Sequence, residues 1–331
     1  MTKVYARAKI NLTLNVLGRR PNGYHDLELI FQPVSLCDEL DIQANDRDEL
    51  VFTCSDPEFQ GEDNLVCRGY RAMKARFGDR IGGLTIHLDK RIPSGAGMAG
   101  GSTDCAALLV WMNQYYDLGL TCQMLIDIGV TLGADVPACM IPHATLGRGV
   151  GEILSDIHIH REYPLLLIKP RISLNTAEMF QALDEAYAAG EAVTVGGTGA
   201  AAAATESVDP AAGTSAIAAA TESVNPAAET LAMVAAMETG DLAAMGQHLY
   251  NVFETVVPCK EQIAGYKRVL LEAGALGSLM TGSGSVVYGI FEKKEARDAA
   301  YRKLACLKGC ELYVCDAVNL WDEKAESLQT E

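Results

Sequence analysis

A glycine-rich segment links a predicted strand to a predicted helix in this chain: Pro93-Ser94-Gly95-Ala96-Gly97-Met98-Ala99-Gly100-Gly101-Ser102-Thr103-Asp104. Before it, apolar and polar residues alternate over Gly83–Ile92, the pattern of a half-buried strand. After it, apolar residues from Cys105 to Tyr116 recur at helical spacing, and the expected N-cap is Ser102, Thr103 or Asp104. Backbone N–H groups and the positive end of the helix dipole then meet at one point, which predicts an anion site, with phosphate as the best candidate.

This loop differs from the common P-loop, because no Gly-Lys-Ser/Thr ends it and no lysine opens the helix. A tight turn without a ligand uses the same glycines, so the segment alone does not establish a function. A second small-residue loop, Thr281-Gly282-Ser283-Gly284-Ser285, leads into a predicted strand that ends at Phe291. It is either a tight turn or a loop whose amides and hydroxyls close over a phosphorylated substrate.

Length and composition indicate a globular protein of two domains. The 331 residues are 49% hydrophobic and 21% charged, and no apolar run approaches the roughly 20 residues of a membrane span. The N-terminus lacks the apolar segment of a signal peptide, so we expect a cytoplasmic protein. The ten cysteines form no CxxC pair, which favours reduced thiols over zinc sites or disulfides. The net charge of −16 argues against a nucleic-acid partner.

Helices mixed with a few strands predict an α+β protein, divided at residues 1–160 and 161–331. Besides the elements around the glycine loop, we expect strands over Ala8–Val16, Leu27–Phe31, Leu165–Ile168, Ser285–Phe291 and Leu312–Ala317. Helices are expected over Val66–Phe77, Cys122–Gly129, Thr230–Glu238, Glu261–Ala273 and Lys294–Leu307. We interpret Gly147–Gly151 as a glycine-rich connection, and His158 and His160 as alternating residues of a strand without the partners of a metal site.

One segment, 189–228, has an unusual composition. Its residues 202–212 are repeated, with one change, at 218–228, and both copies are rich in alanine. Such a sequence has little apolar surface to bury. We interpret the segment as a flexible or weakly helical surface insert without a catalytic role.

Three places outside the loops carry residues suited to chemistry. Lys9 and Asn11 lie on the same face of their predicted strand, where they are either a solvated edge or a cation and an amide beside a phosphate. Asp135, in Gly133–Pro137, is either a capping residue or a positioned carboxylate. Phosphoryl transfer to a hydroxyl needs a carboxylate to orient the hydroxyl and a cation to stabilise charge, and Asp135 with Lys9 would supply both. Tyr24-His25 are either surface residues or a grip for a planar base.

Taken together and in this order, five segments resemble the GHMP small-molecule kinases: Ala8–Leu12, Gly18–His25, Pro93–Asp104, Gly133–Pro137 and Thr281–Gly284. The first two resemble members that phosphorylate a cytidine diphosphate alcohol of the non-mevalonate isoprenoid pathway. The resemblance covers nearly the whole chain apart from the Ala-rich insert. It implies a two-domain GHMP kinase fold, with an N-terminal domain like ribosomal protein S5 and a C-terminal GHMP α+β domain.

The resemblance also implies roles for individual residues, with ATP as phosphoryl donor and Mg²⁺ bridging its phosphates. The catalytic pair is Lys9 and Asp135. The nucleotide is held by Asn64, Lys90 and the loop Pro93–Thr103. The substrate, a cytidine diphosphate alcohol that is phosphorylated on its 2-hydroxyl, is held by Asn11, Tyr24, His25, Phe31, Phe180, Gly282, Ser283 and Gly284. No residue is assigned as a metal ligand.

The chain departs from the family's most familiar pattern at Met98-Ala99, where Leu-Gly is common, which removes one permissive backbone position. Two other functions remain open from the residues. A GHMP kinase for another alcohol, such as homoserine, is disfavoured by Tyr24-His25. A nucleotide-binding protein without catalysis is disfavoured because simple phosphate binding does not need Asp135.

Overall fold

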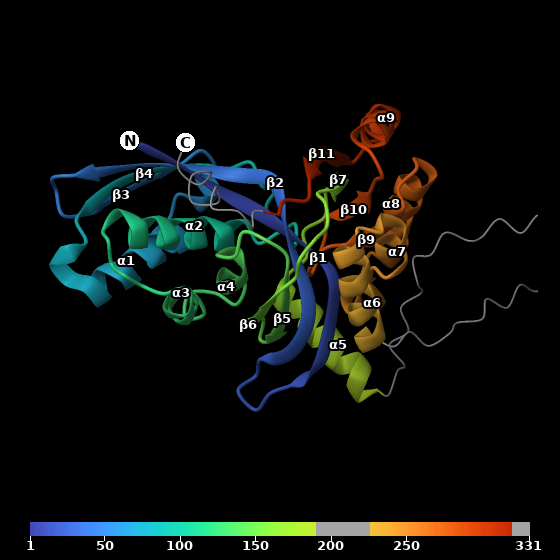
Figure 1. Ribbon diagram of the computed structural model, residues 1–331, viewed down its shortest axis with the longest axis horizontal. Coiled ribbons are helices and arrows are strands. Elements are labelled where there is room, and N and C mark those ends of the chain that lie inside the picture. The colour runs from blue at the N-terminus through green and yellow to red at the C-terminus, as the bar shows by residue number, and fades with distance from the viewer. Residues whose placement is uncertain (190–225, 320–331) are drawn as a thin grey trace, which may run out of the picture.

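The computed structural model describes residues 1–189 and 226–319 (Figure 1). This part of the chain forms two sheets with helices packed on them, which agrees with the predicted α+β class. The first sheet holds β1 (Thr2–Arg19), β2 (His25–Asn45), β3 (Leu50–Cys54), β4 (Gly83–Asp89), β5 (Thr145–Gly149), β6 (Ile153–Asp156) and β8 (Tyr250–Asn251). The second sheet has the order β11 (Cys310–Asp316), β7 (Pro164–Pro170), β10 (Val287–Ile290) and β9 (Gly277–Met280).

Helices pack on these sheets in two groups, α1 to α4 below the left part of the first sheet and α6 to α9 beside the second (Figure 1). Their bounds are α1 (Leu65–Phe77), α2 (Gly100–Tyr115), α3 (Cys122–Gly129), α4 (Val136–Cys139), α5 (Thr176–Ala188), α6 (Pro226–Thr239), α7 (Leu242–Gln247), α8 (Lys260–Glu272) and α9 (Lys294–Leu304). Short 3₁₀ turns lie at Pro57–Phe59, Gly78–Arg80 and Val252–Thr255. Within the described ranges, no helix is long and apolar enough to cross a membrane.

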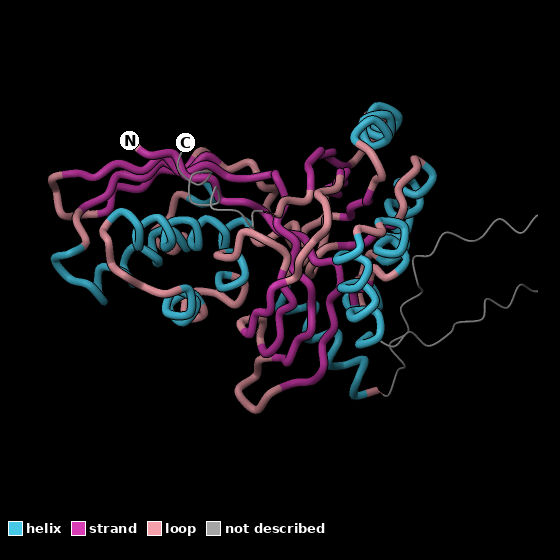
Figure 2. The backbone as a smooth tube through the Cα atoms, viewed as in Figure 1, coloured by secondary structure: helices cyan, strands magenta, loops and turns pink. Residues whose placement is uncertain are grey.

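The long antiparallel hairpin β1–β2 joins the two halves of the molecule (Figure 2). The open end of the hairpin pairs with β4 through residues 39–45 of β2. The end near the turn pairs with β5 through residues 27–31 of β2 and with the short parallel strand β8 through Thr13 and Leu14 of β1. Val34 also forms a bridge with Ala317. Because β8 and Ala317 come from the second half of the chain, the halves share backbone pairing. The division at residue 160 stays a prediction.

Burial of β1 differs from the predicted pattern. Alternation predicts one buried face, but every residue from Ala8 to Val16 is buried. Ile10 and Leu12 pack into a core shared with α6 and the second sheet, and each such buried side chain contributes about 1.5–3 kcal/mol. The register with β2 shifts between Arg7 and Lys9 and again between Asn11 and Thr13. These irregularities flank Lys9–Asn11, and such bulges re-aim side chains at functional sites.

Several expected boundaries were wrong in detail. Helix α2 begins at Gly100, and its N-cap is Ala99 without a side-chain cap bond, so Ser102, Thr103 and Asp104 lie inside the first turns. Strand β4 ends at Asp89, because the next three residues make other contacts described below.

Two further expectations about the middle of the chain need correction. Part of the expected connection Gly147–Gly151 is strand β5, and His158 and His160 lie outside the strands. Of the predicted insert, residues 226–228 open α6, and residues 190–225 lie outside the described part. The ten cysteines are free thiols, as expected.

Ala99 has a left-handed backbone, with φ 59° and ψ 31°, at the position where the family pattern has glycine. This conformation destabilises the folded state by roughly 1–2 kcal/mol when the residue is not glycine. Glycine avoids that strain, but it also makes the unfolded chain more flexible, which offsets part of the gain in stability. We expect Ala99→Gly to raise the free energy of unfolding by about 0.5–1 kcal/mol, measured by urea denaturation. The matched control is Ala299→Gly, on the exposed face of α9, which should lower it by about 1 kcal/mol. A destabilised Ala99→Gly protein would contradict the prediction.

Candidate active site

A cavity of about 1290 Å³ lies between the hairpin β1–β2, the glycine-rich loop, helix α5 and the loop at 281–285. We call residues 93–103 the phosphate loop. Many of the predicted site residues line this one cavity: Lys9, Asn11, Tyr24, His25, Phe31, Gly95, Gly97, Ala99, Gly100, Gly101, Ser102, Asp135, Phe180, Gly282, Ser283 and Gly284. Residues from six separate stretches of the sequence therefore meet at one place.

The centre of the cavity holds Lys9 and Asp135. The side chain of Lys9 is 8% exposed, and its Nζ donates to Asn11 Oδ1 at 2.8 Å and to the Gly97 carbonyl at 3.1 Å. The same Nζ lies 3.6 Å from Asp135 Oδ2. Lys9 is therefore not part of a solvated edge. Asp135 occupies the N-cap position of α4 without making a side-chain cap bond, so its carboxylate is available to the cavity.

The phosphate loop has the backbone of an anion site. Gly95, Gly97 and Ala99 all have positive φ, at 55°, 72° and 59°. The first α2 hydrogen bond runs from Thr103 N to Ala99 O, so the N–H groups of Gly100, Gly101 and Ser102 precede the helical ladder. Those three residues line the cavity, where the helix dipole adds its positive end.

The two small-residue loops touch through their backbones. A Cβ on Gly97 would lie 2.1 Å from the Thr281 carbonyl oxygen, and one on Gly282 would lie 2.7 Å from the Gly97 carbonyl oxygen. Ser285 N also donates to Gly95 O at 3.3 Å. This close approach explains why glycine stands at 97 and 282, because any side chain there would push the loops apart.

Asn11 presents an unused donor. Its side-chain Oδ1 accepts from Lys9, while its Nδ2 is buried and has no partner among the described residues. Its backbone is fixed by Thr281 Oγ1, which accepts from Asn11 N at 2.9 Å, and by Tyr288 OH, which donates to Asn11 O at 2.9 Å. An unpaired buried donor costs about 1–3 kcal/mol, so an acceptor on a bound ligand would stabilise this arrangement.

At the far end of the cavity, His25 meets helix α5. Its ring stacks on Phe180 with centroids 4.5 Å apart and an interplanar angle of 17°, and Phe180 packs edge-on against Phe253. His25 Nε2 lies 2.8 Å from Asp184 Oδ1, and Asp184 Oδ2 lies 3.4 Å from Arg19. Tyr24 is exposed, whereas Phe31 is buried with its ring centroid 5.5 Å from Lys9 Nζ.

The sequence patterns did not indicate Asp184 or Phe253 as site residues. No local pattern connects Asp184 with His25, which is 159 residues away. The spacing of Phe180 and Asp184, four residues apart on a helix, places both on one face and was the available signal.

Two predicted nucleotide residues are not part of the cavity wall. Asn64 caps α1, with Oδ1 accepting from Val66 N at 2.9 Å and Nδ2 donating to Phe59 O. Lys90 Nζ donates to Asp38 and, at 2.8 Å, to Asp104. A contact of either residue with adenosine stays a prediction. Of the loop residues, Ala96 and Met98 point into the core, and Thr103 Oγ1 donates to the Arg7 carbonyl.

In the described ranges, no three His, Cys, Asp or Glu side chains gather as a metal site. Mg²⁺ in kinases is usually held by one or two carboxylates together with the phosphates of the nucleotide, so it does not require such a cluster. Asp135 is already paired with the Lys9 ammonium at 3.6 Å, so it is not assigned to the metal.

Comparison with known proteins identifies the family. Residues 64–142 match the GHMP kinases N terminal domain, and residues 233–309 match GHMP kinases C terminal. The chain is 34% identical to a 4-diphosphocytidyl-2-C-methyl-D-erythritol kinase from Alkaliphilus metalliredigens, over 96% of this chain and 98% of that protein. It is 36% identical to a kinase of the same name from Synechococcus sp., over 91% of this chain and 88% of that protein.

Comparison with solved structures supports the same family. A crystal structure of 4-(cytidine 5'-diphospho)-2C-methyl-D-erythritol kinase matches with a TM-score of 0.71 and 25% identity, covering 96% of this chain and all of that one. Homoserine kinase from Cytophaga hutchinsonii shares the fold, with a TM-score of 0.65 and 18% identity. The match covers 96% of this chain and 95% of that one. The chain belongs to the family of 4-diphosphocytidyl-2-C-methyl-D-erythritol kinases, within the GHMP kinases.

Proposed function

We propose that this chain transfers the γ-phosphoryl group of ATP to the 2-hydroxyl of 4-diphosphocytidyl-2-C-methyl-D-erythritol. The observation that carries the proposal is the Lys9–Asp135 pair, 3.6 Å apart, in a cavity with the phosphate loop on one side and His25 with Phe180 on the other. A bond forms between the hydroxyl oxygen and the γ-phosphorus, the β–γ bridging P–O bond breaks, and ADP leaves. The hydroxyl proton is released toward Asp135.

Lys9 and Asp135 have complementary roles in this proposal. Asp135 orients the acceptor hydroxyl and accepts its proton, and Lys9 stabilises the negative charge that spreads over the transferred group. In a loose transition state the hydroxyl is only weakly deprotonated, so a general base contributes little. Positioning and electrostatic stabilisation therefore supply most of the rate enhancement. The bonds of Lys9 to Asn11 and Gly97 hold its ammonium in place before the substrate arrives.

The phosphate loop and the α2 N-terminus would bind the triphosphate, with Asn64 toward adenosine as the resemblance implies. Mg²⁺ would supply charge neutralisation of the phosphates when bound. The cytidine diphosphate alcohol would occupy the cavity from Asn11 to Phe180, with the free Asn11 Nδ2 as a donor to its oxygens. Gly282, Ser283 and Gly284 would close over it from the second half of the chain.

The proposal is tested with purified protein, MgATP and a panel of alcohols, by following ADP release and the mass of the phosphorylated product. We expect a product that gains one phosphoryl group only with 4-diphosphocytidyl-2-C-methyl-D-erythritol. Turnover of homoserine instead would reassign the substrate. Nucleotide binding without any product from the panel would contradict the proposal.

We further propose that Asp184 is a positioning residue for His25. Its carboxylate accepts from Nε2–H, which fixes the ring and leaves Nδ1 as an acceptor. We expect Asp184→Asn to raise KM for the alcohol about tenfold and leave kcat within about threefold, since orientation and not charge at the reacting atoms is lost. Steady-state kinetics measure both, and Glu178→Gln, an exposed carboxylate on α5 outside the cavity lining, is the control. A fall in kcat at unchanged KM would contradict this role.

A further inference from the structure

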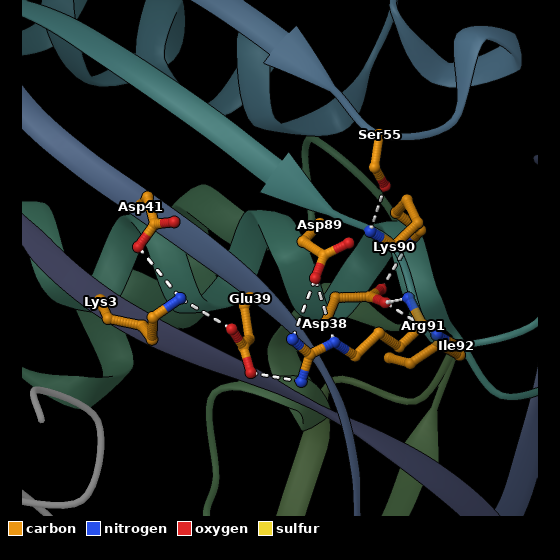
Figure 3. A network of polar contacts seen from close by, with 9 residues as sticks. All are labelled: Lys3, Asp38, Glu39, Asp41, Ser55, Asp89, Lys90, Arg91 and Ile92. Atoms are coloured by element: carbon orange, nitrogen blue, oxygen red, sulfur yellow. Dashed lines mark hydrogen bonds and ion pairs between the residues drawn. The ribbon is translucent and has the colours of Figure 1, made fainter.

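A buried cluster of three charged side chains lies behind the phosphate loop. It consists of Lys90, Asp38 and Asp104, whose side chains are 9%, 0% and 1% exposed, and we call it the Lys90 cluster. Lys90 follows β4, Asp38 lies in β2, and Asp104 lies in α2. Figure 3 shows Asp38 between Lys90 and the backbone of Arg91 and Ile92.

The cluster ties down the start of the phosphate loop. Asp38 Oδ1 accepts from the backbone N–H groups of Arg91 and Ile92, the latter at 2.7 Å, and Ile92 is the residue before Pro93. Lys90 N donates to Ser55 Oγ at 2.8 Å. These bonds pull the chain out of the β4 ladder, and this is why the strand ends at Asp89 instead of Ile92.

The same cluster ties down the end of the loop. Lys90 Nζ donates to Asp38 Oδ2 and, at 2.8 Å, to Asp104 Oδ2, one turn into α2. The first residue of α2 packs against this ammonium, because a Cβ on Gly100 would lie 3.2 Å from Lys90 Nζ. One carboxylate, Asp38, therefore connects both ends of the loop through a single cation.

The opposite charges of Lys90 and the two aspartates stabilise this link between the two ends of the loop. Burial raises the pKa of Asp104 well above its ordinary value, an effect that Lys90 opposes and Asp38 adds to. Burial lowers the pKa of Lys90, but the two carboxylates outweigh it and the pKa is raised. Removing the cation from between two buried carboxylates leaves uncompensated charge, which is far more costly than losing a surface pair.

We propose that Lys90 is a positioning residue that holds both ends of the phosphate loop through Asp38 and Asp104. This inference rests on the proposed nucleotide site and differs from an adenosine contact in what it predicts. A contact with the base would affect ATP alone. A shift of the loop amides would weaken every ligand that binds through its phosphates.

Equilibrium binding tests this on the full chain, with MgATP and with inorganic tripolyphosphate as a competitor of ATP. We expect Lys90→Met to weaken both by a similar factor, at least about tenfold, at temperatures where circular dichroism shows a folded protein. The control is Lys3→Met, because Lys3 also lies between two carboxylates, Glu39 and Asp41, in the outer part of the network (Figure 3). Lys3→Met should leave both affinities unchanged.

The double variant gives a second, independent measurement. Removing the Asp104 charge relieves the imbalance that Lys90→Met creates, so Lys90→Met/Asp104→Asn should bind MgATP more tightly than Lys90→Met. If Lys90→Met alone does not fold, Asp104→Asn is compared with the unaltered protein, and equal weakening of both ligands supports the inference. Loss of ATP affinity at unchanged tripolyphosphate affinity overturns it. Additive effects of the two substitutions on MgATP affinity in the double variant also overturn it. So does normal MgATP affinity in a Lys90→Met protein that is folded but less stable, and so do unchanged affinities for both ligands in Asp104→Asn.

These measurements do not depend on turnover. A protein that binds MgATP but phosphorylates no alcohol in the panel would refute the proposed function and leave the role of Lys90 intact. Normal turnover together with any of the overturning results would refute only the role of Lys90.

Discussion

Asp135→Asn should lower kcat by about two to four orders of magnitude while MgATP binding stays within about threefold. The substitution keeps the shape of the side chain and removes the charge and the proton acceptor. Asp135 makes no cap bond to α4, and Lys9 keeps its bonds to Asn11 and Gly97, so little else in the site depends on the carboxylate. Single-turnover kinetics with saturating MgATP measure the chemical step directly.

The control for Asp135→Asn is Asp46→Asn, an exposed residue in the turn between β2 and β3. It removes the same charge far from the cavity and should leave kcat unchanged. If Asp135→Asn turns over at a near-normal rate, Asp135 neither orients nor deprotonates the hydroxyl, and the assignment of the pair fails.

Lys9→Met should have the second largest effect, a loss of about two to three orders of magnitude in kcat. Methionine has a similar length but carries no charge for the transferred phosphoryl group. The change also leaves Asn11 Oδ1 and the Gly97 carbonyl without their donor, which should lower the free energy of unfolding by about 1–3 kcal/mol. The kinetic and the stability effects are therefore expected together and are measured separately.

Urea denaturation measures the loss of stability separately. Kinetic assays at urea concentrations well below the unfolding midpoint report on folded protein only, so they measure the loss of catalysis. Lys294→Met is the control, since Lys294 pairs with Asp316 at the surface with its side chain 63% exposed. An exposed pair of this kind contributes at most about 1 kcal/mol, and its loss should not affect turnover. A folded Lys9→Met protein with normal kcat would remove Lys9 from the mechanism.

Local sequence patterns predicted most of the elements. Helix Cys122–Gly129 has the predicted bounds, and α1 begins one residue earlier than predicted. The expected N-cap of α2 was wrong because the capping side chains of Ser102, Thr103 and Asp104 do not decide where this helix begins. In the structure Ala99 takes that position with a left-handed backbone, and the cluster behind the loop holds Asp104 inside the helix.

In the candidate site, too, local patterns indicated some residues, whereas the partners that fix them did not show in the sequence. A strand period of two placed Lys9 and Asn11 on one face. The segment Gly133–Pro137 offered Asp135 as a capping residue or a positioned carboxylate, and the family resemblance selected the second role and added Phe180. The partners that fix these residues come from distant parts of the chain: Asp184 holds His25, Thr281 fixes the backbone of Asn11, and Gly97 accepts from Lys9. Such pairs leave no periodic pattern in a single sequence.

By itself, the sequence determined the glycine-rich phosphate loop between a strand and a helix, because backbone freedom and hydrophobic period are local properties. It also determined the family, through five short segments in a fixed order. Only the tertiary structure decided that the cation nearest the end of β4, Lys90, faces two buried carboxylates and not the cavity. The reason is that burial of a charge depends on every element packed around it, and those elements come from β2 and α2 as well as from the segment after β4.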